Sequence, residues 1–250
     1  MPAVTTTVIG SYLSPYVRKV LVCLDIKRIA YEIDSIVPFY GNDEFARLSP
    51  VRRIPVLIDD SVTLADSSVI CAYLDERYPE PPLLPKGAPL RARARWLEEF
   101  ADTRMGEVFI WHLFNQLVIR RFVWGETPDE QVLKQAREEE IPQVLAYLEG
   151  ELPSDGFVFG AISLADIALA AFFRNAAFAR YAIDAARWPK TAAFVARALD
   201  HPSFAKLRRF EEVLLRTPIA NHRAALKDAG APVSADTFGT AVPRRGLLTI

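Results

Sequence analysis

Two short stretches of the sequence place polar side chains where a helix begins, and chemistry can be expected there. Ser14 stands directly before Pro15 and an amphipathic helical pattern, and Asp66 and Ser67 stand before a second such pattern. The first backbone N–H groups of a helix have no partner within it, so a helix start is a natural seat for a carboxylate. The simplest role for these side chains is helix capping. A cation, Arg53, precedes the second stretch.

A predicted β-hairpin comes directly before the helix start at Asp66 and Ser67. An apolar run at 56–58 is followed by turn residues at 59–61 and by a second run at 62–64. Pro55 stands at the mouth of the first strand, where a residue without an N–H is tolerated, and an X-Pro bond in a tight site can be cis. A cis bond would turn the backbone of Ile54 outward, to pair with a ligand instead of a strand.

The elements around these residues predict an α/β domain at 1–80. A β-branched strand at 5–9 is followed by a helix that begins at Pro15 and by a second strand at 30–36. The order strand, helix, strand favours parallel pairing through a right-handed crossover. With an irregular loop or short helix at 39–49, the hairpin and its helix, the order becomes β-α-β-loop-β-β-α.

Proline and glycine mark the remaining boundaries. Prolines crowd the segment 81–89, which we interpret as a linker. Helical patterns fill 90–217 and predict an all-helical domain, with one helix at 90–116, another at 129–150 interrupted at Pro142, and three more after residue 163. Proline and glycine return at 218–250, which predicts an extended tail.

The tail is more apolar than a freely solvated segment needs to be. The residues responsible are Val242, Leu247, Leu248 and Ile250. We therefore expect the tail to dock on its own subunit or on a neighbouring one.

Composition narrows the class of protein. With 51% hydrophobic and 24% charged residues, the chain has the composition of a soluble globular protein, and its net charge of −1 gives no reason to expect a nucleic acid or membrane partner. The start of the chain lacks a signal-peptide pattern, so we expect a cytoplasmic protein. Cys23 and Cys71 form no Cys-x-x-Cys pair and the three histidines are not spaced as ligands, so we expect no metal site and no disulfide.

The motif Ser-Pro-Tyr at 14–16 stands where a glutaredoxin-like domain keeps Cys-Pro-Tyr-Cys. Here the chain resembles the cytosolic glutathione S-transferases, in the group that uses serine. Further motifs carry the resemblance over roughly residues 4–215: Arg-Ile-Pro-Val-Leu at 53–57, Asp-Ser-Ser at 66–68, Tyr-Pro at 78–79 and Ser-Leu-Ala-Asp-Ile at 163–167. Each motif is weak alone, but their order and spacing are specific.

The resemblance implies a thioredoxin-like N-terminal domain that binds glutathione, an α-helical C-terminal bundle, and a homodimer. Ser14 would donate a hydrogen bond to the glutathione sulfur, and Ser11 offers a second hydroxyl nearby. Ile54, before the expected cis Pro55, would pair with the cysteinyl unit. The remaining roles in glutathione binding are assigned to Arg53 for the glycyl carboxylate and to Asp66 and Ser67 for the γ-glutamyl amine and carboxylate.

A second-substrate pocket is expected against the helical domain. Met105, Phe109 and His112 recur on one helix face and, with Tyr16, could line this pocket. The same face could equally be core or subunit contact. The pair Ser163 and Asp166 is expected to serve the folding of the helical domain.

The resemblance implies a glutathione S-transferase that joins the glutathione thiolate to small, mostly apolar electrophiles, without a metal. Two alternatives remain open from the sequence. One is a non-catalytic binding or scaffolding protein of the same fold. The other is a glutathione-dependent peroxidase, dehalogenase or isomerase.

Overall fold

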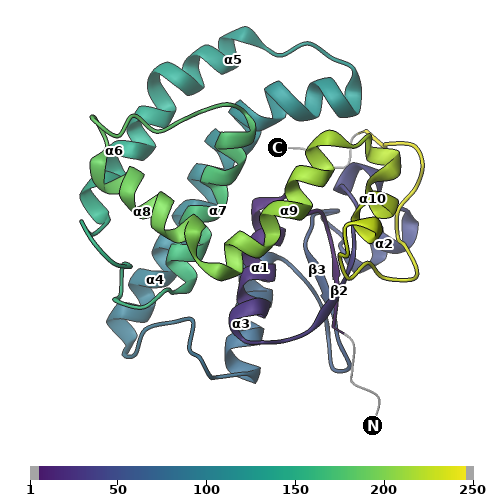
Figure 1. The fold of residues 1–250 in the computed structure, drawn as a ribbon, viewed down its shortest axis with the longest axis horizontal. Helices are drawn as coiled ribbons and strands as arrows, with labels where there is room; N and C mark the ends of the chain where they lie inside the picture. Colours follow the sequence, from purple (N-terminus) through teal and green to yellow (C-terminus); the bar gives the residue numbers. More distant parts are fainter. Residues whose placement is uncertain (1–5, 246–250) are drawn as a thin grey trace. The chain divides into compact units, whose positions relative to one another are not determined.

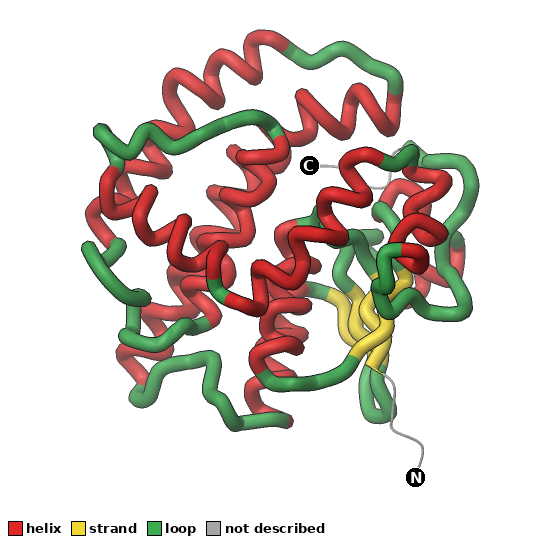
Figure 2. The backbone as a smooth tube through the Cα atoms, viewed as in Figure 1, coloured by secondary structure: helices red, strands yellow, loops and turns green. Residues whose placement is uncertain are grey.

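The computed structural model describes residues 6–245. The chain forms two compact units, Met1–Pro81 with Pro202–Ile250, and Pro82–His201. We call the first the sheet unit and the second the helical unit. Figure 2 shows the strands gathered in one sheet, and their residues all fall in the sheet unit. Some residues named in the sequence predictions lie outside the described residues. They are Thr5 of the first predicted strand and the tail residues Leu247, Leu248 and Ile250.

A four-stranded sheet in the order β2-β1-β3-β4 forms the centre of the sheet unit. Its strands are β1 (Thr6–Ile9), β2 (Tyr31–Asp34), β3 (Val56–Ile58) and β4 (Thr63–Ala65). β1 and β2 are parallel, as the strand-helix-strand order predicts, whereas β1 with β3 and β3 with β4 are antiparallel. The predicted hairpin is therefore confirmed.

Helices cover both sides of this sheet (Figure 1). They are α1 (Pro15–Ile26), η1 (Pro38–Tyr40), α2 (Asp43–Leu48) and α3 (Ser67–Arg77). The apolar spacing of α1 puts Val17, Leu21 and Leu24 in the core. Cys23 of α1 and Cys71 of α3 are buried cysteines that form no disulfide, with their sulfurs 3.5 Å apart, so both contribute to helix packing.

The helix α9 (Pro202–Arg216) packs against α1 and belongs to the sheet unit by its contacts, although the sequence assigns it to the helical domain. Arg18 Nε donates to Glu211 Oε1 at 2.6 Å in a buried ion pair. The rings of Tyr12 and Phe210 stack beside it with centroids 4.9 Å apart. A pattern in α9 alone reveals an apolar face but not the element that this face meets.

The tail is not extended from its start. It begins with η4 (Ile219–Asn221) and α10 (His222–Asp228), because glycine and the next proline come only at Gly230 and Pro232. The chain then runs beside β2 and α2 of its own unit (Figure 1). Docking on its own subunit is thus confirmed, but Val242 is not the anchor, since it is 70% exposed.

The helical unit consists of α4 (Ala88–Phe100), the π-helix η2 (Ala101–Trp124), α5 (Glu130–Gln135), the π-helix η3 (Ala136–Glu140), α6 (Ile141–Glu151), α7 (Leu164–Phe178) and α8 (Pro189–Asp200). Pro142 stands in the first turn of α6, as expected for a restart. The helix predicted to end at residue 116 continues to Trp124, because no breaker occurs before Gly125, whose φ is +67°.

The buried helix α7 forms the centre of the helical unit and packs against α4, η2 and α8. A capping box begins it: Asp166 Oδ2 accepts hydrogen bonds from Ser163 N at 2.8 Å and Ser163 Oγ at 2.6 Å. The predicted structural role of this pair is confirmed. Within residues 6–245, none of the helices combines the length and the apolar character that crossing a membrane would require.

Candidate functional site

The register of the sheet gathers the predicted site residues at one end. Ile9 of β1 pairs with Val56 of β3, and Val56 pairs with Ala65 of β4. The residues next to this last paired row are Gly10, Pro55 and Asp66, which adjoin the three strands at the same end of the sheet. Residues from three distant parts of the sequence therefore meet at one end of the sheet. A pattern in any single segment cannot reveal such a meeting.

Gly10 is closely packed against Val17 and Ile54 at this end of the sheet. A Cβ atom on Gly10 would lie 2.4 Å from Val17 Cγ2 and 3.4 Å from Ile54 Cβ, and its φ is +155°. Its N–H donates to Asp34 O at 3.0 Å. Because only glycine allows this close approach, the start of α1 and the Ile54 segment pack directly against the end of β1.

Ser14 is the N-cap of α1 and is half-buried. Its Oγ accepts a hydrogen bond from Val17 N at 3.4 Å. This cap uses an oxygen lone pair and leaves the O–H free to donate, so capping and donation to a thiolate are compatible. Ser11 is only 4% exposed, and its Oγ accepts from Leu13 N at 3.3 Å, so Ser14 is the more accessible hydroxyl.

The bond between Ile54 and Pro55 is cis, as the sequence suggests. Both residues are buried, and the ladder of β3 begins only at Val56. The backbone of Ile54 therefore lies just outside the paired region of the sheet, where a peptide ligand could extend the pairing.

Asp66 is the N-cap of α3, and Ser67 is the first residue of the helix. Asp66 Oδ1 accepts from Ser68 N at 2.9 Å and from Val69 N at 3.1 Å. The φ of Asp66 is +86°, a sparsely populated conformation for a residue other than glycine, and such residues cluster at binding sites. Asp66 is exposed while Ser67 is buried, so a carboxylate and the first N–H groups of a helix lie together.

A buried lysine stands behind this helix start. Lys19 of α1 is 1% exposed, and its Nζ donates to Ser68 Oγ at 3.0 Å. Its ammonium reinforces the positive end of the α3 dipole. Lys19 follows the Ser-Pro-Tyr motif closely, but no motif in the sequence assigns it to the site. The available signal is a cation inside the apolar face of α1, between Val17 and Val20.

Arg53 is exposed, and a buried serine holds its backbone. Ser49 Oγ accepts from Arg53 N at 3.0 Å and donates to Arg53 O at 2.9 Å. The neighbouring Arg52 has a φ of +52°, and its Nη2 donates to Gly41 O at 2.8 Å. Arg52 Nε is buried without a hydrogen-bond partner among the described residues. The segment 49–53 thus presents one exposed cation on a fixed backbone.

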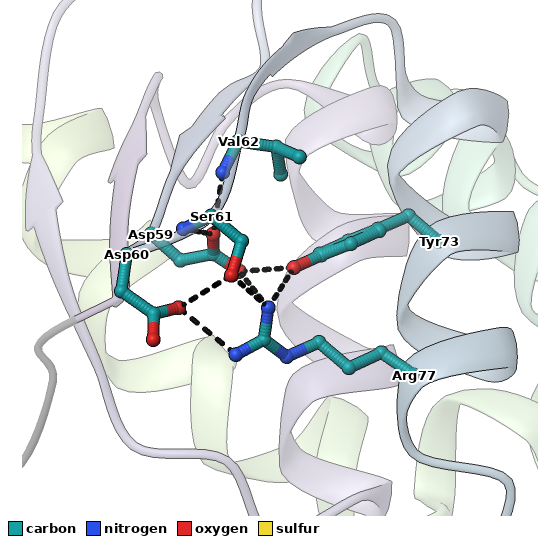
Figure 3. A network of polar contacts seen from close by, with 6 residues as sticks. All are labelled: Asp59, Asp60, Ser61, Val62, Tyr73 and Arg77. Atoms are coloured by element: carbon teal, nitrogen blue, oxygen red, sulfur yellow. Dashed lines mark hydrogen bonds and ion pairs between the residues drawn. The ribbon is translucent and has the colours of Figure 1, made fainter.

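A polar network ties the far end of the hairpin to α3 (Figure 3). Asp59 Oδ2 accepts from Tyr73 OH at 2.6 Å, and Arg77 donates to Asp60 Oδ1 at 2.9 Å and to Tyr73 OH at 2.6 Å. Burial works to raise the pKa of Asp59, but hydrogen bonds from Tyr73, Ser61 and Val62 outweigh it and hold the pKa below its usual range. The network fixes the direction of the helix whose other end carries Asp66.

The residues predicted for a second-substrate pocket have different environments. Met105 and Phe109 are fully buried in the helical unit, and the rings of Phe109 and Phe173 lie 5.2 Å apart. His112 Nδ1 lies 2.7 Å from Glu140 Oε2. Tyr16 is half-buried in the sheet unit. The His112 side chain is 31% exposed and so does not share the full burial of Met105 and Phe109. The pocket itself stays a prediction.

The described residues offer no candidate set of metal ligands. Across residues 6–245, no group of three or more His, Cys, Asp or Glu side chains is arranged to hold a metal ion.

Two family models match the chain. The model described as glutathione S-transferase, N-terminal domain, matches residues 8–82, and the model of the C-terminal domain matches residues 110–202. The chain is 30% identical over 212 residues to the probable maleylacetoacetate isomerase of Vibrio cholerae, covering 79% of this chain and 92% of that protein.

Other relatives match over a shorter part. The chain is 39% identical to a stringent starvation protein A homolog of Haemophilus ducreyi over 80 residues, which are 32% of this chain and only 37% of that protein. Among solved structures, a glutathione S-transferase from Methylobacterium radiotolerans in complex with glutathione sulfonate has a TM-score of 0.68 and 26% identity, covering 81% of this chain and 93% of that chain. The expected fold is confirmed, and the chain belongs to the cytosolic glutathione S-transferase family.

Proposed function

We propose that the protein binds glutathione and transfers its thiolate to a small, mostly apolar electrophile, with Ser14 as the residue that favours the thiolate. The observation that supports this proposal is the shared end of β1, β3 and β4, from which the Ser14 loop, the Ile54 backbone and the α3 start all continue.

The proposed ligand, glutathione, is complementary to the residues at this end of the sheet. Glutathione is a peptide with two carboxylates and one ammonium group. The α3 start with Ser67 suits the γ-glutamyl carboxylate and Asp66 suits the ammonium. Ile54 offers backbone pairing to the cysteinyl unit, and Arg53 offers a cation to the glycyl carboxylate.

The chemistry requires a thiolate at neutral pH. A thiol in solution has a pKa of about 8.5, so only a few per cent is ionised. The Ser14 O–H and the start of α1 together need to favour the anion by only about 1.4 kcal/mol to lower that pKa by one unit. The thiolate then attacks an electrophilic carbon, a carbon–sulfur bond forms, and the displaced group leaves with the electron pair.

Calorimetry with glutathione tests the proposal. We expect one site per chain. Absence of binding at millimolar glutathione, equivalent to less than about 4 kcal/mol, would remove the proposed function and leave a non-catalytic scaffold of the same fold.

A glutathione-dependent isomerase is the second candidate. It is favoured by the match to a probable maleylacetoacetate isomerase, which covers 92% of that protein. In an isomerase, the thiolate adds to a carbon of an unsaturated substrate and leaves again, so glutathione is not consumed. A panel of aryl halides, enals, hydroperoxides and cis-configured unsaturated diacids separates the two, because conjugation depletes free thiol and isomerisation does not.

The proposal includes a cytoplasmic setting and a homodimer. The cytosol keeps thiols reduced, which suits both a glutathione-using site and the reduced thiols of Cys23 and Cys71. Sedimentation of the purified protein tests the dimer, and a monomer at micromolar concentration would contradict it.

A further inference from the structure

The tail after α10 packs along the open edge of the sheet. Ile33 N of β2 donates to Pro232 O at 2.7 Å, and Ser234 N donates to Ile33 O at 3.0 Å, which forms a short parallel bridge. We call residues 232–244 the C-terminal strap. Because β2 is an edge strand, the strap provides partners for backbone groups that would otherwise face solvent.

The strap also binds the segment 39–43 between β2 and α2. Asn42 N donates to Phe238 O at 2.8 Å, Thr240 N donates to Tyr40 O at 2.7 Å, and Arg244 N donates to Phe39 O at 2.8 Å. These bonds pair backbone N–H and C=O groups of the segment with groups of the strap. The strap therefore helps to hold segment 39–43 in place.

Asp34 joins the strap to the predicted site. Its buried carboxylate pairs with Arg223 of α10 and accepts from Phe238 N at 2.7 Å. Its backbone carbonyl accepts from Gly10 N at 3.0 Å, at the end of β1. Arg223 Nη2 in turn donates to Ser234 O at 2.8 Å. Asp34 thus contacts both the strap and the end of the sheet where the predicted site residues lie.

A second route leads from the strap to Arg53. Gly41 forms an antiparallel bridge with Gly239 of the strap, and Gly41 O accepts from Arg52 Nη2 at 2.8 Å. Arg52 N donates to Ser49 O at 2.7 Å, and Ser49 Oγ holds Arg53 on both sides of its backbone. Every link is a hydrogen bond within the sheet unit, so displacing Gly41 changes the support of Arg53.

We propose that the C-terminal strap is a positioning element for glutathione: it holds segment 39–43 and, through Arg52 and Ser49, keeps Arg53 oriented toward the glycyl carboxylate. This inference rests on the proposed function. The strap acts on affinity for glutathione and leaves the ionisation of the bound thiol unchanged, because the main-chain bond from Gly10 N to Asp34 O and the Ser14 cap of α1 do not involve strap residues.

Truncation after Gly230 tests the proposal, with circular dichroism as the check that the variant is folded. We expect the dissociation constant for glutathione to rise about fivefold or more, the low end for coupling between two parts of a protein. The pKa of the bound thiol should stay at its wild-type value. Arg53→Ala added to the truncation should weaken binding less than it does in the full chain, because both changes remove the same interaction.

A point variant decides the matter if the truncated chain does not fold. A Cβ on Gly239 would lie 3.0 Å from Ile36 Cγ2, so Gly239→Val displaces the strap locally. Val242→Ser is the matched control, because the Val242 side chain is exposed. We expect weaker glutathione binding in Gly239→Val and wild-type binding in Val242→Ser.

Two failures are distinguishable. If the wild type does not bind glutathione, the proposed function is wrong. If the wild type binds and the folded Gly239→Val and truncation variants bind equally well, or if Arg53→Ala costs the same affinity with and without the strap, the strap has no positioning role and only the present inference fails.

Discussion

Lys19 Nζ and Ser68 Oγ lie 3.0 Å apart and connect the middle of α1 to the first turn of α3. The ammonium group is buried, so its field is screened less by salt than that of a surface cation. It stands behind the helix start that we assign to the γ-glutamyl carboxylate. The pair therefore offers a direct test of electrostatic support at this site.

Lys19→Met should weaken glutathione binding and also cost some stability. Removing one partner of a buried charged contact destabilises the fold, so thermal unfolding is measured beside affinity. The missing cation should raise the dissociation constant about tenfold, equivalent to about 1.4 kcal/mol. Lys206→Met is the matched control, because Lys206 is 63% exposed and pairs with Asp25. Equal affinity in the two variants would show that Lys19 only packs.

Arg53→Ala should reduce glutathione affinity far more than stability. A charge-assisted hydrogen bond to a carboxylate contributes about 1.5 to 3 kcal/mol, whereas an exposed cation adds little to folding. Calorimetry and thermal unfolding measure the two effects separately, and Arg47→Ala, an exposed arginine of α2, is the control. Unchanged affinity in Arg53→Ala would transfer the role to Arg52.

Two substitutions at Asp66 separate its cap from its charge. Asp66→Ala removes both and should cost about 0.5 to 2 kcal/mol of stability, together with glutathione affinity. Asp66→Asn keeps a capping oxygen and tolerates the positive φ, so stability should stay near wild type while affinity falls. If the Asp66→Asn variant binds glutathione as tightly as the wild type does, the carboxylate does not pair with the ammonium.

His222 should make stability depend on pH. Burial lowers the pKa of His222, although backbone carbonyls of Thr217 and Leu214 act in the opposite direction. With a folded pKa below the unfolded value of about 6.5, the stabilisation is complete above that value and is lost as the pH falls through it. The melting temperature should drop between about pH 7 and pH 5 by more in the wild type than in His222→Gln. Parallel curves for the two proteins would contradict this assignment.

The parts of the fold that depend on local patterns could be predicted from the sequence. The hairpin at 56–65, the helix after Ser14 and the restart at Pro142 all follow from turn chemistry, capping and apolar spacing. Local signals were sufficient there because each element is specified by residues next to one another in the chain.

Contacts between distant segments could not be predicted in the same way. The position of Gly10, Pro55 and Asp66 at one end of the sheet depends on how the strands pair, and the bond from Lys19 to Ser68 depends on the packing of α1 against α3. The docking of α9 and the strap involves partners about two hundred positions away in the sequence. No alternation or spacing within a segment encodes such a partner.

The central claim concerns Ser14, and a thiol titration tests it most directly. The ultraviolet absorbance of the thiolate of bound glutathione would be followed against pH in the wild type, Ser14→Ala and Ser14→Cys. The Ala variant should still bind glutathione, show a higher apparent thiol pKa, and lose about one to two orders of magnitude in conjugation rate, as expected for a lost charged hydrogen bond. The thiolate introduced by Ser14→Cys should attack glutathione disulfide, release one glutathione thiolate and form a mixed disulfide with the other glutathione, so that the variant gains thiol transfer. A wild-type titration curve and turnover in the Ala variant would contradict the account and make Ser14 a helix cap alone.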